Sequence, residues 1–210
     1  MAFVRKSFPV GPLQCNCTVL GDPETGVGYV CDPGGNPERI MAAVAELGVT
    51  ITGIVHTHAH LDHFLAAGDI RRKTGAPIWL HRGDKFLWDA LEQQCRAFGV
   101  PYTPQPDPDS WLEHEQELAC GGTCIHTPGH TPGSSSFYFK DAGLLLAGDT
   151  LFLGSVGRTD LPGGDSRALQ FSIQTRLYNL DENAVVVTGH GPETRIGQEM
   201  RHNAFVRAAR

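Results

Sequence analysis

The chain of 210 residues has a hydrophobic content of 40% and a formal net charge of −6. Its length suits a single domain, residues 1–210, with a substantial core. The negative charge and the lack of a basic cluster argue against nucleic-acid binding, and the lack of a long apolar run argues against a membrane span.

The hydrophobic pattern predicts an α/β fold in which strands and helices alternate. Strands are expected over residues 3–9, 14–20, 27–31, 51–55, 77–80, 123–126, 135–139, 143–147 and 184–188. Helices are expected from Pro37 to Gly48 and over residues 62–73, 83–97 and 166–178. Asn36 is predicted to cap the first helix, and the proline-rich stretch 99–111 to form an irregular loop.

Six cysteines, none in a CxxC pair, indicate the redox compartment. No charged and apolar leader opens the chain. We therefore expect cytoplasmic residence and reduced, mostly buried thiols. The cysteines stand at positions 15, 17, 31, 95, 120 and 124.

Four metal-binding side chains lie close together in the run 57–63, directly after a predicted buried strand. In an extended segment, residues two apart point to the same side, so His58 and His60 can bind one ion together. If a helix begins after His60, Asp62 and His63 lie about 100° apart around its first turn and face a second ion. We interpret the run as a metal site.

Three further predicted strands also end in a glycine followed at once by a candidate ligand. These strand-end residues are His130, with Gly129 before it, Asp149 after Gly148, and His190 after Gly189. Taken alone, a strand-end histidine is more often structural, but four such strand ends mark one pocket. Two ions with three or four protein ligands each would use all the candidates and leave positions for water or substrate.

The other histidines lack this support. His56 is one strand position out of phase with the candidate ligands, so we expect it to point away from them. His81 and His114 are predicted to lie on the surface or in loops. His126 suits a core or supporting role equally, and His202 is expected to pack or to cap a helix.

Five motifs carry a resemblance to a known family. They are the HxHxDH run at 58–63, Pro-Gly-His-Thr-Pro-Gly at 128–133, Ala-Gly-Asp at 147–149, Gly-His-Gly-Pro at 189–192 and the Asp-Pro-Gly-Gly turn at 32–35. Together they resemble the metallo-β-lactamase superfamily, and within it the glyoxalase II group (hydroxyacylglutathione hydrolases), most of all its short single-domain bacterial form. The resemblance implies an αββα sandwich, two mixed sheets flanked by helices, with the site at one edge of the sheets.

The resemblance also implies a role for each candidate ligand. The first metal ion would be held by His58, His60 and His130, the second by Asp62, His63 and His190, and both by Asp149. None of these ligands is replaced, which implies two divalent metal ions, zinc first, with iron or manganese also accepted. The implied reaction is hydrolysis of a glutathione thioester, such as S-lactoylglutathione, by a metal-bound hydroxide, with Asp62 and Asp149 as catalytic residues.

Arg158 is the candidate substrate contact. It matches a basic position that meets the glutathione part of the substrate in glyoxalase II. The alternative, that Arg158 pairs with Asp160 or Asp165, stays open.

Three other functions also stay open. Persulfide dioxygenases share the fold and the Gly-Arg-Thr-Asp run at 157–160, and they use one iron held at positions that match His58, His130 and Asp149. Against this reading, Val156 stands where those enzymes usually carry a cysteine. Lactone or β-lactam hydrolysis is chemically accessible to the same site, although no lactam-binding loop is recognised. The third alternative is a metal-stabilised interaction module without enzymatic activity.

Overall fold

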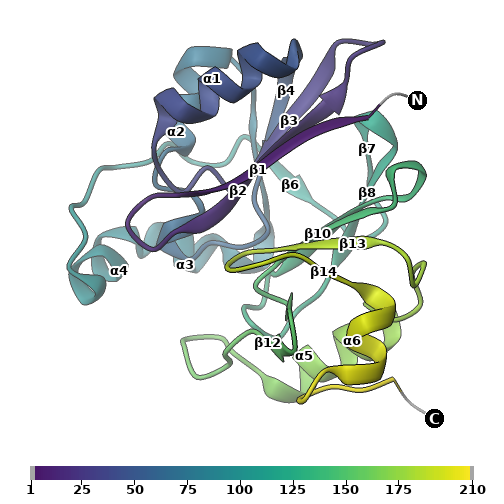
Figure 1. The fold of residues 1–210 in the computed structure, drawn as a ribbon. Coiled ribbons are helices and arrows are strands. Elements are labelled where there is room, and N and C mark those ends of the chain that lie inside the picture. The colour runs from purple at the N-terminus through teal and green to yellow at the C-terminus, as the bar shows by residue number, and fades with distance from the viewer. Residues whose placement is uncertain (1–2, 209–210) are drawn as a thin grey trace. The chain divides into compact units, whose positions relative to one another are not determined.

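The computed structural model describes residues 3–208. The chain divides after Leu112 into two compact units, here called unit 1 and unit 2, and each contains one six-stranded sheet (Figure 1). The expectation of one domain over residues 1–210 remains a prediction.

The sheet of unit 1 follows the order β1-β2-β3-β4-β5-β6. Its strands are β1 (Val4–Val10), β2 (Cys15–Asp22), β3 (Val27–Cys31), β4 (Thr50–Val55), β5 (Ile78–His81) and β6 (Ser110–Leu112). The first three strands pair antiparallel across short turns, whereas β3 to β6 pair parallel. Parallel neighbours need long crossover connections, and helices supply them here.

The crossover helices of unit 1 cover its sheet. They are α1 (Pro37–Leu47), α2 (Ala67–Thr74), α3 (Lys85–Asp89) and α4 (Leu91–Phe98). Helices α1 and α2 lie beside each other in Figure 1, with α1 on β1 and β2 and α2 on β4. Apolar side chains such as Ile40, Ile54 and Ile70 are fully buried between the helices and the sheet.

The predicted helix over 62–73 is wrong at its start. Instead, a 3₁₀ turn spans Leu61–His63 and the α-helix begins at Ala67. A continuous helix would need Ala66 N–H to bond the Asp62 carbonyl, but this N–H donates to the Pro33 carbonyl at 2.9 Å. The close approach of Gly34 to the Asp62 carbonyl oxygen blocks the helical alternative.

Two further helix predictions are corrected in unit 1. Asn36 adopts a left-handed conformation (φ 50°) and does not cap α1; its side chain accepts from Gly11 N–H at 2.8 Å instead. The predicted helix 83–97 breaks at Ala90 into α3 and α4. Gln94 donates its side-chain amide to the Leu87 carbonyl, which Leu91 N–H would otherwise use.

The sheet of unit 2 follows the order β14-β13-β10-β9-β8-β7. Its strands are β7 (Glu117–Leu118), β8 (Gly122–His126), β9 (Ser135–Phe139), β10 (Leu144–Gly148), β13 (Val185–Thr188) and β14 (Thr194–Arg195). Strands β10 and β13 pair parallel, and the other neighbours pair antiparallel. A separate hairpin joins β11 (Leu151–Phe152) to β12 (Ser155–Val156).

Helices cover one side of this sheet, where α5 (Ser166–Ser172) and α6 (Ile196–His202) lie near each other in Figure 1. A π-helical segment, Ile173–Leu177, continues α5. Leu169, Ile173 and Leu177 pack with Leu145 and Val186 in the core of unit 2. The sequence pattern did not predict helix α6 or the short strands β6, β7, β11, β12 and β14. Among residues 3–208, no helix has the length and apolar character that crossing a membrane requires.

Candidate metal centre

Two side chains from the helical part of unit 1 hold the backbone of residues 59–61. Gln94 Nε2 donates to the Ala59 carbonyl and Gln94 Oε1 accepts from Leu61 N–H, both at 3.0 Å. The buried Asp84 carboxylate accepts from Ala59 N–H at 3.1 Å. The loop that carries the first two candidate histidines is therefore held on both sides of Ala59.

The rings of His58 and His60 are buried and face each other. His58 Nε2 lies 3.1 Å from His60 Nδ1, with the rings nearly perpendicular. The other nitrogen of His58 lies 3.1 Å from Thr57 Oγ1. Two ring nitrogens this close either share one proton or direct their lone pairs at a common ion.

The Asp32 carboxylate orients two residues of the run. It accepts from Thr57 N–H at 2.8 Å and from Thr57 Oγ1 at 2.7 Å, and its Oδ2 also lies 3.1 Å from His63 Nδ1. A carboxylate at this distance places the histidine proton on Nδ1. His63 Nε2 is then left with a lone pair, and it lies 3.7 Å from Asp62 Oδ2.

In unit 2, Asp149 lies near two histidines. Its Oδ2 is 3.6 Å from His130 Nε2 and 3.8 Å from His190 Nε2. His130 Nδ1 donates to the Arg158 carbonyl at 2.7 Å, which leaves the lone pair on Nε2, the nitrogen nearer Asp149. The arrangement repeats that of His63, with one nitrogen fixed by an oxygen acceptor and the other directed toward a carboxylate.

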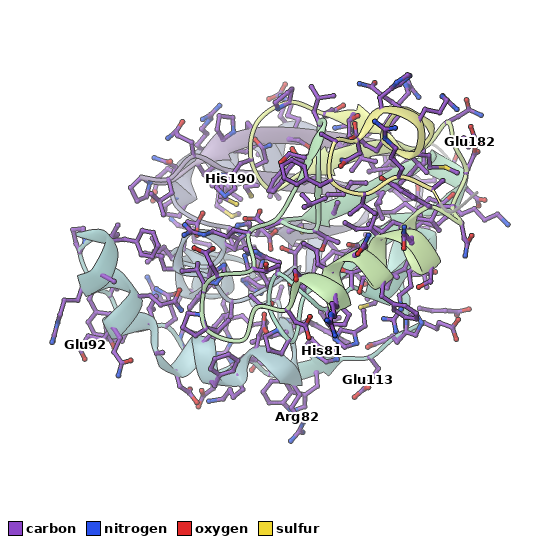
Figure 2. The ribbon with its side chains drawn as sticks, turned by 90° about the horizontal axis from the view of Figure 1, so that it is seen from below. His81, Arg82, Glu92, Glu113, Glu182 and His190 are labelled. Atoms are coloured by element: carbon purple, nitrogen blue, oxygen red, sulfur yellow. The ribbon has the colours of Figure 1, made fainter. Side chains whose placement is uncertain are left out.

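The parallel pairing of β10 and β13 explains why two of these residues meet. Gly148 pairs with Thr188, so the residues that follow leave the sheet at the same edge. Figure 2 shows His190 beyond one end of β13 and Glu182 before the other. The Thr188 hydroxyl donates to the His190 carbonyl at 2.7 Å and fixes the turn.

Two glycines let the chain approach the carbonyls of the acidic residues. A Cβ on Gly34 would lie 1.6 Å from the Asp62 carbonyl oxygen, and one on Gly157 would lie 1.8 Å from that of Asp149. Any side chain at these positions would displace the backbone that carries Asp62 or Asp149. The Asp-Pro-Gly-Gly turn thus has a spatial role beside the run 57–63.

We call His58, His60, Asp62 and His63 the unit 1 ligand group, and His130, Asp149 and His190 the unit 2 ligand group. Their donor atoms suit a divalent ion such as zinc, which binds imidazole nitrogen and carboxylate oxygen at about 2.0–2.2 Å. Two ligands of one tetrahedral ion then lie about 3.4 Å apart. The separations of 3.1 to 3.8 Å within each group agree with this spacing.

The histidines outside these groups have structural surroundings. His56 lies buried against Trp88, its Nδ1 lies 3.2 Å from the Trp79 carbonyl, and burial lowers its pKa to about 4. His126 donates to the Pro132 carbonyl, and burial lowers its pKa as well.

Three histidines lie nearer the surface. His81 is half-buried and accepts from Gly83 N–H, and His114 is exposed. His202 was expected to pack or to cap a helix, but it is exposed as the last residue of α6, and the C-cap position is Asn203.

Arg158 pairs with Asp160, which the sequence left open as an alternative to a substrate contact. Its Nε and one terminal nitrogen each donate to an Asp160 carboxylate oxygen at 2.7 Å. The pair is exposed, and Arg158 lowers the pKa of Asp160 to about 2. The Arg158 guanidinium is thus engaged by a neighbouring carboxylate.

Sequence reasoning missed the residues that support the unit 1 ligand group. Asp84 and Gln94 stand more than 20 positions after the run, and nothing in the sequence pattern connects them with it. Cys15 was expected only to be buried, yet its Sγ lies 3.4 Å from His63 Nδ1. Asp32 was noted only as part of a turn motif, although its carboxylate orients His63.

A family model described as the metallo-beta-lactamase superfamily matches residues 10–190. The chain belongs to this superfamily. It is 38% identical to "Hydroxyacylglutathione hydrolase GloC" of Haemophilus influenzae, over 95% of this chain and 96% of that protein. The family match thus agrees with the resemblance that the five sequence motifs indicate.

Solved structures support the same fold. The chain matches that of BLEG-1 B3 metallo-beta-lactamase with a TM-score of 0.89 and 38% identity, over 97% of this chain and 99% of that one. It matches TTHA1623 in a di-iron-bound form with a TM-score of 0.89 and 37% identity, over 96% and 100%. ETHE1 from Myxococcus xanthus gives a TM-score of 0.79 and 26% identity, over 96% and 83%.

These similarities confirm the predicted fold class, with two mixed sheets flanked by helices. They also confirm the prediction of a metal-binding hydrolase of the metallo-β-lactamase fold. Which metal is bound, and by which side chains, are predictions that rest on the geometry of the two ligand groups.

Proposed function

We propose that this superfamily member hydrolyses glutathione thioesters such as S-lactoylglutathione, using two divalent metal ions. The first ion would be held by His58, His60 and His130, the second by Asp62, His63 and His190, and both by Asp149. The observation that carries the proposal is the hydrogen bonding of the ring nitrogens of two histidines. His63 and His130 each have Nδ1 fixed by an oxygen acceptor and Nε2 directed toward a carboxylate.

When bound, the ions supply Lewis acidity and a water of lowered pKa. The Asp62 carboxylate accepts a hydrogen bond from the attacking water and turns its oxygen lone pair toward the thioester carbonyl carbon. As the new C–O bond forms, the C–S bond breaks, and the products are a carboxylate, a thiol and a proton released to solvent. A thiol of ordinary pKa, about 8.5, leaves without a dedicated acid.

The similarity to GloC supports a glutathione-derived substrate. The similarity to the di-iron form of TTHA1623 supports a site for two ions and makes iron an alternative to zinc. Because the BLEG-1 relative is described as a β-lactamase, a β-lactam ring-opening assay belongs beside the thioester assay.

A persulfide dioxygenase is the second candidate function. The Gly-Arg-Thr-Asp run at 157–160, which persulfide dioxygenases share, supports it, and the backbone of this run contacts both the His130 ring and the Asp149 carbonyl. One iron held by His58, His130 and Asp149 would serve that reaction. Oxygen uptake with glutathione persulfide would identify it.

The deciding experiment measures metal content together with hydrolysis of S-D-lactoylglutathione. We expect about two ions per chain, clear turnover, and loss of both in the Asp149→Ala variant. Asp141→Ala, an exposed aspartate of unit 2, is the matched control and should behave as the parent. One iron per chain without hydrolysis would favour sulfur oxygenation. Partner binding that depends on metal, with no turnover of any substrate, would favour an interaction module.

A further inference from the structure

The chain between Asp149 and Arg158 forms a loop whose two ends both lie at the unit 2 ligand group. It leaves the sheet at Asp149 and returns through the hairpin of β11 and β12. At the returning end, a Cβ on Gly157 would lie 1.8 Å from the Asp149 carbonyl oxygen and 3.2 Å from His130 Cγ. The Arg158 carbonyl then accepts the His130 Nδ1 proton at 2.7 Å. The position of this loop therefore affects where both candidate ligands lie.

The hairpin in this loop is very small. Its two strands share two residue pairs, Leu151 with Val156 and Phe152 with Ser155. An isolated two-stranded hairpin is at best marginally stable in water. Leu151 at the base is fully buried in the core of unit 2, whereas Leu153 near the tip is 42% exposed. The tip therefore depends on contacts from outside the hairpin.

Two side chains at the end of the chain, Glu199 in α6 and Asn203 directly after it, supply such contacts. The Glu199 carboxylate accepts from Gly154 N–H at 2.9 Å, and Asn203 Nδ2 donates to the Ser155 carbonyl at 3.0 Å. The two side chains are also joined to each other, because Asn203 Nδ2 donates to Glu199 Oε2 at 2.8 Å. One pair of side chains thus binds a backbone donor and a backbone acceptor at the hairpin tip.

Glu199 is a buried carboxylate that the proposed reaction does not use. It is 1% exposed, and Asn203 is fully buried. Burial of a carboxylate is costly unless hydrogen bonds compensate it. Three donors do so here, namely Gly154 N–H, Asn203 Nδ2 and, at 2.5 Å, the Thr194 hydroxyl. Because the hairpin tip supplies one of these donors, its displacement would leave the buried charge less well compensated.

We propose that Glu199 is a positioning residue for the metal centre. Together with Asn203 it holds the tip of the hairpin, and through the returning backbone at 157–158 it keeps His130 and Asp149 in place. The inference rests on the proposed metal-dependent function and assigns a role to residues outside both ligand groups. Since neither Glu199 nor Asn203 is a ligand, their substitution should weaken metal binding without removing a donor atom.

The first test measures zinc affinity by competition with a chromophoric chelator. Glu199→Met keeps a side chain of similar length but cannot accept from Gly154 N–H. Loss of a direct partner of a ligand typically costs roughly 10- to 100-fold in metal affinity, and for this more distant residue we expect about 3- to 30-fold. Unchanged affinity in Glu199→Met would overturn the proposal.

The conservative variant Glu199→Gln should stay within about two-fold of the parent. Its amide oxygen can accept from Gly154 N–H and Asn203 Nδ2, while its amide nitrogen donates to the Thr194 hydroxyl. Asn203→Asp is a second variant that keeps the acceptor for the N–H groups of residues 205 and 206 but cannot donate to the Ser155 carbonyl. It should weaken zinc binding as Glu199→Met does, and it carries the test if Glu199→Met does not fold.

A control distinguishes positioning from a general loss of stability. The Tyr178 hydroxyl donates to the Val206 carbonyl at 2.6 Å, a hydrogen bond of the same end of the chain that does not include the hairpin. Tyr178→Phe should therefore lower the free energy of unfolding while zinc affinity stays at the parent value. If Tyr178→Phe and Glu199→Met weaken zinc binding in proportion to the stability that each loses, Glu199 acts on folding alone and the proposal fails.

The second test separates this inference from the proposed function. Amide hydrogen exchange is followed by mass spectrometry on the full chain after removal of metal with EDTA. Faster exchange of residues 150–158 in Glu199→Met but not in Glu199→Gln, with β8 and β9 unchanged, would support the role of Glu199 even if no thioester is hydrolysed. Thioester hydrolysis with unchanged exchange and unchanged zinc affinity in Glu199→Met would retain the function and refute this inference.

Discussion

At the scale of single residues, Asp32 supports the unit 1 ligand group through contacts with two of its neighbours in the run 57–63. Its carboxylate fixes Thr57 through two hydrogen bonds and lies 3.1 Å from His63 Nδ1. Asp32 itself is buried and adopts a left-handed conformation (φ 52°). A left-handed conformation is unfavourable for a residue other than glycine. The contacts of Asp32 with Thr57 and His63 are therefore made at a cost in conformational energy.

We therefore predict that Asp32→Ala weakens metal binding without removing any ligand. Loss of an outer partner of a metal-binding histidine typically reduces metal affinity by roughly 10- to 100-fold. Competition with a chromophoric chelator measures this, and Asp89→Ala, an exposed aspartate that pairs with Lys85, is the control. Unchanged affinity in Asp32→Ala would show that Asp32 has no part in orienting His63.

At the scale of elements, helix α4 supports the loop of the run 57–63. Gln94 makes three hydrogen bonds, to the carbonyls of Ala59 and Leu87 and to Leu61 N–H. Its neighbour Gln93 lies exposed on the same helix. Gln94 thus links the break between α3 and α4 to the position of the loop, which Asp84 also holds.

The Gln94→Ala variant should lose metal to a chelator faster than the parent, because residues 59–61 are no longer held. Gln94→Glu keeps an acceptor for Leu61 N–H but cannot donate to the Ala59 and Leu87 carbonyls, so we expect an equal or larger effect. Gln93→Ala is the matched control. If Gln94→Ala and Gln93→Ala release metal at the same rate, the loop does not need this support.

The elements also show what the sequence could and could not predict. The patterns that point to the candidate ligands are local, namely the HxHxDH run after one predicted strand and a glycine followed by a polar residue after three others. The break at Phe64–Ala66 could not be predicted, since it follows from the packing of Gly34 on the Asp62 carbonyl, nearly 30 positions away. The support by Asp84 and Gln94 depends on tertiary packing in the same way, and two- or three-residue strands carry too little periodicity to be recognised.

At the scale of the whole molecule, the cysteines of both units share one property, since most of them are buried as expected. No disulfide occurs within residues 3–208; Cys120 is half-buried, and the other five cysteines are buried. Burial raises the pKa of the Cys15 and Cys124 thiols to about 12 and that of the Cys17 and Cys31 thiols well above their ordinary range. The folded chain thus keeps these thiols protonated where the unfolded chain would ionise them.

This difference makes stability depend on alkaline pH. A raised pKa in the folded state contributes stability that is fully present below the unfolded value, 9.0, and is lost as the pH rises toward 12. Urea unfolding between pH 8 and pH 11 should therefore show a falling free energy of unfolding. Cys124→Ala should flatten this dependence, by up to about 3 kcal/mol at pH 11, whereas Cys120→Ala should not. Parallel curves for the parent and Cys124→Ala would contradict the prediction.

The hydrogen bond from His130 to the Arg158 carbonyl can couple the binding of a metal ion to the binding of a second ligand nearby. It makes one stretch of backbone, residues 157–159, serve both as wall of a cavity of about 410 Å³ in unit 2 and as support of a candidate metal ligand. If an occupant of the cavity shifts that stretch, it changes the affinity of the ion, and the ion must change the affinity of the occupant by the same factor. Metal titrations with and without S-methylglutathione, a thioether that cannot be hydrolysed, would then give one coupling free energy from either direction.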